Sequence, residues 1–189
     1  MAEAPGGAGR DPGEILLVGA SKMNDAAACR EAIAAGIDAL GENRVQEMVK
    51  KLAEHAYDGA PLHFIGHLQR NKVKQVVGQA ALIQSVGSLE LLEEIEKVAA
   101  ARELAQDILL EVNVGREAAK SGFAPEETFA AAEAALGKSH VRVRGLMTIP
   151  PADADRDTNM RYFEKVRTLY VDINAKLFHN GLEYLSMGM

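Results

Sequence analysis

The chain has 189 residues, of which 48% are hydrophobic and 25% are charged, and its formal net charge is −6. This composition is ordinary for one globular domain, and the scattered basic residues exclude the positive stripe with which proteins bind nucleic acid. A single cysteine, Cys29, excludes a disulfide framework, and no apolar run is long enough to span a membrane. We therefore expect a cytoplasmic protein without nucleic-acid or membrane partners.

Strand-like and helix-like segments alternate along the chain. Residues 1–13 are rich in Gly, Ala and Pro, and we expect them to form a flexible segment before a domain that covers 14–189. The uncharged run 15–21, which ends at Lys22, predicts a strand buried on both faces, followed by an alanine-rich helix that contains Cys29 as a small buried side chain. Further strands are expected within 38–43, 62–67, 81–86, 107–113, 141–149 and 184–189, with helices over 45–52, 73–77 and 88–102, one that Pro125 opens, and one around 163–173.

The seven predicted strands, each followed by a helix-like segment or a chain end, indicate parallel βα units. Such units build either a doubly wound sheet or a (β/α)₈ barrel, and their even spacing favours the barrel. The sequence contains no eighth strand. We therefore expect an α/β fold of the (β/α)8 TIM type, incomplete in this chain, with seven of eight strands.

Lys22 is the most informative single residue, because it directly follows the first apolar run. Barrel strands place functional side chains at their carboxyl ends, and a partly desolvated lysine can condense with a carbonyl group to form a Schiff base. The alternative is a solvated lysine where a strand runs out into water. Other polar residues follow the later strands, among them Asn43, Lys120 and Ser186.

Several other kinds of site are excluded by their spacing. His63 and His67 lie four residues apart on a predicted strand, about 13 Å at roughly 3.3 Å per residue, which is too far to share one metal ion. No nucleophile elbow, phosphate-binding loop or dinucleotide fingerprint occurs in the sequence. We therefore expect no metal site, and triad hydrolases, nucleotide hydrolases and dinucleotide oxidoreductases are disfavoured.

Six motifs in order resemble one family, the pyridoxal phosphate homeostasis proteins, whose single domain is similar to the N-terminal barrel of bacterial alanine racemases. The resemblance runs from about Gly9 to Met189. The motifs are VGASK at 18–22, GENRVQE at 41–47, HFIGHLQRNK at 63–72, KSGF at 120–123, RGLMTI at 144–149 and LSMGM at 185–189.

The resemblance implies a binding site for pyridoxal 5′-phosphate. It implies that Lys22 carries the cofactor as a Schiff base and that Asn43 lies near it. The segment from Ser186 through Gly188 to Met189 would contribute to the phosphate cradle, and Lys120 would have a secondary role in handling the cofactor. Members of the family usually have a further N-terminal helix and a last strand with an Arg-Ile-Gly segment, and neither occurs in this sequence.

Three functions follow as alternatives. The favoured one is a monomeric, non-catalytic carrier that holds pyridoxal phosphate on Lys22 and supplies it to apoenzymes or salvage enzymes. The second is an amino-acid racemase or a Schiff-base aldolase on the same barrel. A racemase needs a base on each side of the substrate carbon, and the tyrosine that alanine racemases draw from a second domain has no counterpart here. The third is a binding module without a cofactor, in which Lys22 is structural or pairs with an acid such as Glu42.

Overall fold

A computed structural model describes residues 9–118 and 120–188. It contains seven strands in one parallel sheet whose spatial order follows the sequence. The strands are β1 (Val18–Ala20), β2 (Ala39–Glu42), β3 (Leu62–Phe64), β4 (Leu82–Val86), β5 (Gln106–Glu111), β6 (Val141–Thr148) and β7 (Tyr184–Met187). The sheet curls into an incomplete (β/α)₈-type barrel, as the sequence predicted, and β1 and β7 are its edges within the described residues.

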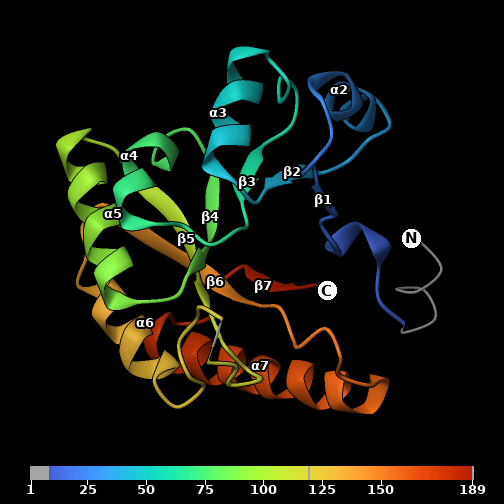
Figure 1. Ribbon diagram of the computed structural model, residues 1–189. Coiled ribbons are helices and arrows are strands. Elements are labelled where there is room, and N and C mark those ends of the chain that lie inside the picture. Colours follow the sequence, from blue (N-terminus) through green and yellow to red (C-terminus); the bar gives the residue numbers. More distant parts are fainter. Residues whose placement is uncertain (1–8, 119, 189) are drawn as a thin grey trace.

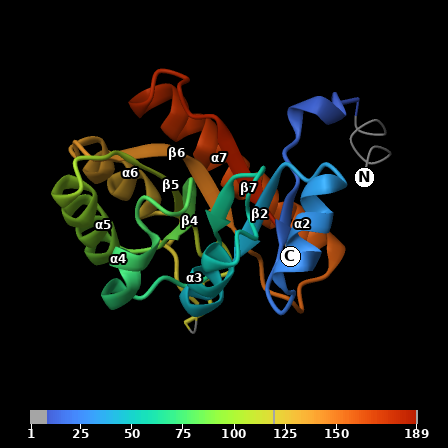
Figure 2. The ribbon, with the colours of Figure 1, turned by 90° about the horizontal axis from the view of Figure 1, so that it is seen from above.

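Helices connect the strands and lie around the outer side of the curved sheet (Figures 1 and 2). They are α2 (Ala26–Ala34), α3 (Val45–Ala53), α4 (Val73–Val76), α5 (Leu89–Ala101), α6 (Thr128–Leu136) and α7 (Arg156–Leu177), with short 3-10 turns η1 (Pro12–Glu14) and η2 (Arg70–Lys72). Within the described residues no helix is long and apolar enough to cross a membrane.

Helix starts show how local sequence sets these boundaries. The side chains of Asp25, Ser88 and Asp155 each accept a hydrogen bond from a backbone N–H in the first turn of α2, α5 and α7. The predicted opening of a helix at Pro125 was wrong. Residues 125–127 form a turn instead, and α6 begins at Thr128.

The first strand also differs from its prediction. Ile15 and Leu16 are 39% and 51% exposed, and β1 begins only at Val18. β1 pairs with β2 alone among the described strands, so one of its sides lacks a neighbour that would bury it. Residues 1–8 of the expected flexible segment lie outside the described residues, and its described end contains η1, which Asp11 caps.

The strands bury side chains on both faces of the sheet. The larger core lies between the sheet and the helices and contains Phe64, Ile83 and Leu146, which are fully buried. On the inner, concave face, Leu82, Leu109 and Met147 form a separate small cluster that packs against Tyr184. Because successive strand residues point to opposite faces, this division identifies which polar side chains face the barrel interior.

Gly145 allows β6 to approach β7 closely. Its φ is +156°, and a Cβ atom there would lie 1.7 Å from the carbonyl oxygen of Tyr184. The β5–β6 register shifts close to this point, between Ile108 and Leu109. Only glycine fits this approach, which keeps β7 next to β6 and thereby places the segment that contains Ser186.

Candidate functional site

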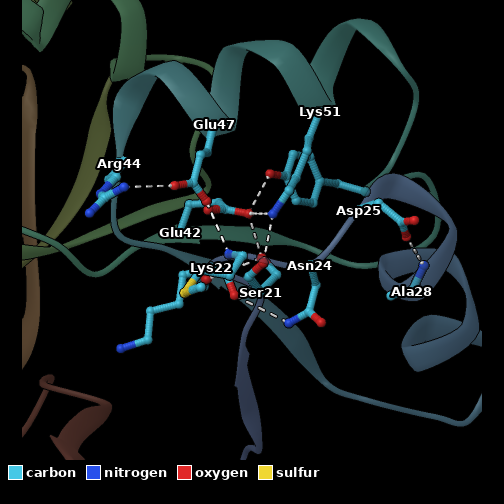
Figure 3. Close-up of polar contacts among 12 residues, drawn as sticks. Ser21, Lys22, Asn24, Asp25, Ala28, Glu42, Arg44, Glu47 and Lys51 are labelled. Atoms are coloured by element: carbon cyan, nitrogen blue, oxygen red, sulfur yellow. Dashed lines mark hydrogen bonds and ion pairs between the residues drawn. The ribbon is translucent and has the colours of Figure 1, made fainter.

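Lys22 lies in a turn two residues after β1, at the carboxyl end of the sheet. Its side chain points away from the ammonium group of Lys51, on the opposite side of the backbone from α3 (Figure 3). Lys22 is exposed, so the described residues do not form the desolvated pocket that we expected around this amine. Among the described residues the Lys22 amine forms no ion pair, and it is open to a reagent in solution.

Glu42 ends β2 and is completely buried on the side that faces α3. Its Oε1 atom accepts hydrogen bonds from Ser21 Oγ at 2.5 Å, Lys51 Nζ at 2.6 Å and Tyr57 OH at 2.9 Å (Figure 3). The alternative in which Lys22 pairs with Glu42 is therefore wrong. The partner of Glu42 is Lys51, whose side chain is only 6% exposed.

The ion pair between Glu42 and Lys51 is buried away from solvent. Burial, followed by the nearby Glu42 carboxylate, raises the pKa of Tyr57 far above its ordinary value. Burial also raises the pKa of Cys29, although Lys51 and a hydrogen bond with Ser21 oppose the shift. Cys29 is 1% exposed, so the prediction of a small buried side chain is confirmed. The Tyr57 hydroxyl and the Cys29 thiol are therefore protonated at neutral pH. Tyr57 donates a hydrogen bond to Glu42, and Cys29 packs as a small buried side chain.

Asn43 comes directly after Glu42 and is half-buried. Its Oδ1 atom is buried and has no hydrogen-bond partner among the described residues. Gly66 lies against it, because a Cβ atom on Gly66 would be 2.0 Å from the carbonyl oxygen of Asn43. Buried polar atoms in native proteins are nearly always satisfied, so this oxygen needs a partner from ordered water or from a bound ligand.

Ser186 belongs to a chain of hydrogen bonds across the inner face of the barrel. Its Oγ donates to Gln84 Oε1 at 2.7 Å, although the two residues are 102 positions apart in sequence. The Nε2 atom of Gln84 lies 2.9 Å from Nδ1 of His63. These contacts join β7, β4 and β3, and they fix the position of the Ser186 hydroxyl.

His63 is 9% exposed, and burial lowers its pKa to about 4. In the unfolded chain the imidazole takes up a proton near pH 6.5, whereas in the folded protein it resists protonation down to about pH 4. The unfolded state therefore binds more protons between these values. We expect this group to remove up to about 3 kcal/mol of stability as the pH falls from 6.5 to 4.

Urea unfolding of the wild type and His63→Gln over this pH range measures the effect. The variant should lose less stability on acidification, because it has no imidazole to protonate. The same loss in both proteins would contradict the assignment of a neutral, buried imidazole.

The other predicted phosphate-site residue, Gly188, follows β7 and is exposed. A Cβ atom there would meet nothing within 4 Å, so the described residues do not require a glycine at this position. Met189 lies outside the described residues. The described part of the expected phosphate segment therefore supplies one positioned hydroxyl, that of Ser186, and open space beside Gly188.

Lys120 is exposed but makes two polar contacts. Its Nζ atom lies 2.6 Å from Glu117 Oε2 and donates to the carbonyl oxygen of Pro150 at 3.4 Å. It lines a cavity of about 590 Å³ with His67, Arg70 and residues at the start of α5. Lys22, Asn43 and Ser186 are not among the residues that line this cavity.

Sequence reasoning missed Lys51, Tyr57 and Gln84. One signal pointed to Lys51: it follows Met48 by three residues and therefore lies on the apolar face of α3, where a lysine needs a buried partner. Gln84 gave a weaker signal as a polar residue inside the otherwise apolar run of β4. Nothing local to Tyr57 indicated that its hydroxyl reaches Glu42.

Comparison with known proteins defines the class of this domain. The family model described as "Alanine racemase, N-terminal domain" matches residues 19–189. An alanine racemase of Clostridium difficile has a TM-score of 0.71 over 92% of this chain and 45% of that chain, and at 17% identity this likeness shows the fold alone.

Closer relatives identify the family. A pyridoxal phosphate homeostasis protein of Pseudomonas aeruginosa is 41% identical over 187 residues, which are 99% of this chain and 79% of the relative. A protein of the same name from Aquifex aeolicus is 41% identical over 182 residues, or 96% and 79% of the two chains. The chain belongs to the family of pyridoxal phosphate homeostasis proteins, and the resemblance drawn from the six motifs is confirmed.

One solved structure that is similar to this chain contains pyridoxal phosphate. PipY of Synechococcus elongatus with bound pyridoxal phosphate is 28% identical to this chain and has a TM-score of 0.82. The match covers 98% of this chain and 86% of PipY. PipY without the cofactor gives a TM-score of 0.85.

Proposed function

We propose that this protein binds pyridoxal 5′-phosphate covalently through Lys22 and acts as a carrier of the cofactor. The observation that carries the proposal is the exposed amine of Lys22 at the carboxyl end of β1, on the side opposite the ion pair of Glu42 with Lys51. A lysine amine attacks the aldehyde of the cofactor, with loss of water, to give a Schiff base. The PipY structure supports the choice of cofactor.

Residues at the carboxyl ends of other strands carry groups that suit such a ligand. The unpartnered Oδ1 of Asn43 supplies a hydrogen-bond acceptor. The Ser186 hydroxyl donates its one proton to Gln84, so it would have to release that bond before it could donate to a phosphate group. The cofactor would contribute an electron sink for reactions of amino groups, and the protein decides whether any reaction follows.

A carrier role is better supported than catalysis. A racemase needs a second base opposite the lysine, and two of the four tyrosines, Tyr57 and Tyr170, have hydroxyl groups that already donate to Glu42 and to the carbonyl oxygen of Leu182. The relatives from Pseudomonas aeruginosa and Aquifex aeolicus are named for homeostasis of the cofactor. The proposal includes a cytoplasmic, monomeric protein whose partners are apoenzymes or salvage enzymes.

A transfer assay tests the carrier role. The loaded protein is mixed with an apoenzyme that requires pyridoxal phosphate, and the recovery of enzyme activity is followed over time. We expect recovery to match the disappearance of bound cofactor from the carrier. In the same samples, exchange of amino-acid α-protons in deuterated water should not exceed that of free cofactor; faster exchange would favour a racemase instead.

Asn43→Ala should weaken cofactor binding without weakening the fold. The side-chain oxygen makes no hydrogen bond within the described residues, so its removal loses none in the free protein. In the bound state one hydrogen bond disappears, which corresponds to about a fivefold to tenfold weaker affinity. Equilibrium binding and thermal unfolding of the variant measure both quantities. Unchanged affinity would remove Asn43 from the site.

A further inference from the structure

The two residues that flank Lys22 are each held by a side chain from α3. Lys51 Nζ donates to the carbonyl oxygen of Ser21 at 2.6 Å, before Lys22. Glu47 Oε2 accepts from the backbone N–H of Met23 at 3.2 Å, after Lys22 (Figure 3). Glu47 and Lys51 lie four residues apart on one helix and so face the same direction.

Met23 has an unusual backbone conformation. Its φ is +64°, a left-handed value that a residue with a side chain adopts at a cost of about 1–3 kcal/mol. Three of the five other such residues, His55, Glu103 and His179, come just after the C-cap of a helix, where a left-handed residue is usual. Met23 follows no helix, and its side chain is 91% exposed, so packing does not impose this conformation. Two hydrogen bonds support it: the backbone N–H of Asn24 donates to the carbonyl oxygen of Ser21 at 3.1 Å and closes a turn around Lys22 and Met23, and the N–H of Met23 donates to Glu47.

The contact of Lys51 with the carbonyl oxygen of Ser21 is more buried than that of Glu47 with Met23. Lys51 is fixed by the buried carboxylate of Glu42, which also accepts a hydrogen bond from Ser21 Oγ. Ser21 is itself buried, and its backbone N–H donates to the carbonyl oxygen of Gly41. The chain before Lys22 is thereby immobilised, whereas the chain after it is held by the turn hydrogen bond of Asn24 and by the more exposed Glu47, whose side chain is 27% exposed.

We infer that Glu47 and Lys51 are positioning residues for Lys22, which help to fix the backbone turn that directs its amine away from α3. The inference rests on the proposed role of Lys22 and extends it to α3. Fixing an amine before it reacts lowers the entropy lost on attack, so that the reaction with an aldehyde is faster. Neither α3 residue touches the cofactor in this account.

Glu47→Ala, compared with Glu47→Gln, tests the inference. Both remove the charge, but glutamine keeps an oxygen that can accept from Met23 N–H. Two readouts are used: the rate at which pyridoxal phosphate is captured at Lys22, trapped by borohydride and quantified by mass spectrometry, and hydrogen exchange of the Met23 amide without cofactor. Glu54→Ala is the matched control, because it removes a carboxylate from the end of the same helix. Arg44→Ala tests the other contact of Glu47, an ion pair at 3.5 Å.

We expect Glu47→Ala to slow capture by about fivefold and to accelerate Met23 exchange by about tenfold, with thermal stability nearly unchanged. In Glu47→Gln the capture rate and the exchange rate of the Met23 amide should stay close to the wild-type values. Glu54→Ala and Arg44→Ala should match the wild type in both rates. Capture and exchange at wild-type rates in Glu47→Ala would overturn the inference. If the wild type captured no cofactor at Lys22, the proposed function would fail, and Met23 exchange alone would decide whether Glu47 holds the turn.

Discussion

Replacing Lys51 with methionine is expected to destabilise the protein by about 3–5 kcal/mol, because the Glu42 carboxylate would remain buried without its cation. Glu42 is completely buried, and water cannot replace the lost ammonium group without rearrangement of α3. This is a large share of the roughly 5–15 kcal/mol that stabilises an ordinary domain. Urea denaturation at neutral pH measures the change.

The double variant Glu42→Gln with Lys51→Met provides the control. It removes both charges, and methionine retains most of the lysine volume, so we expect it to be clearly more stable than Lys51→Met alone. A double variant that is as unstable as the single one would show that volume and hydrogen bonds, rather than an unpaired buried charge, dominate this cluster. Lys50→Met, at an exposed site of the same helix, should change stability little.

Lys22→Ala is expected to abolish covalent capture of pyridoxal phosphate while leaving the fold intact. Lys22 is exposed and the side chain makes no contact that the sheet or α3 needs, so thermal unfolding should remain close to that of the wild type. Noncovalent binding should persist at reduced affinity through the remaining polar groups. Borohydride trapping followed by mass measurement of the intact protein gives the result.

Lys120→Ala is the matched control for that experiment. It removes another amine from a loop at the carboxyl end of the barrel, but this amine pairs with Glu117 and lines the separate cavity. Capture should therefore proceed as in the wild type. If Lys120→Ala were the variant that lost the adduct, the assignment of the two lysines would have to be reversed.

Local patterns predicted the order of strands and helices well. Apolar runs such as β4 and β5 stand out because both faces of a parallel sheet are buried, and Lys22 stands out because it follows such a run. β1 was predicted too long, because an apolar run cannot show that its strand has a neighbour on one side only. The turn at 125–127 was predicted as helix because proline is favoured both at the first position of a helix and at the second position of a β-turn.

The polar contacts were harder to predict, since they join distant parts of the chain. Glu42 was visible at the end of a strand, but whether it pairs with Lys22 or with Lys51 depends on which face of β2 it occupies. The contact of Ser186 with Gln84 likewise depends on how far the sheet curls, which no local segment specifies. Burial of His63, and with it the lowered pKa, follows from the same curvature.

Identifying the modified residue tests the central claim most directly. The wild-type protein is incubated with pyridoxal phosphate at neutral pH, reduced with borohydride, digested and analysed by tandem mass spectrometry. The account predicts one dominant modified peptide, with the pyridoxyl group on Lys22 and unmodified Lys51. A dominant adduct on another lysine, or equal modification of many exposed lysines, would contradict it.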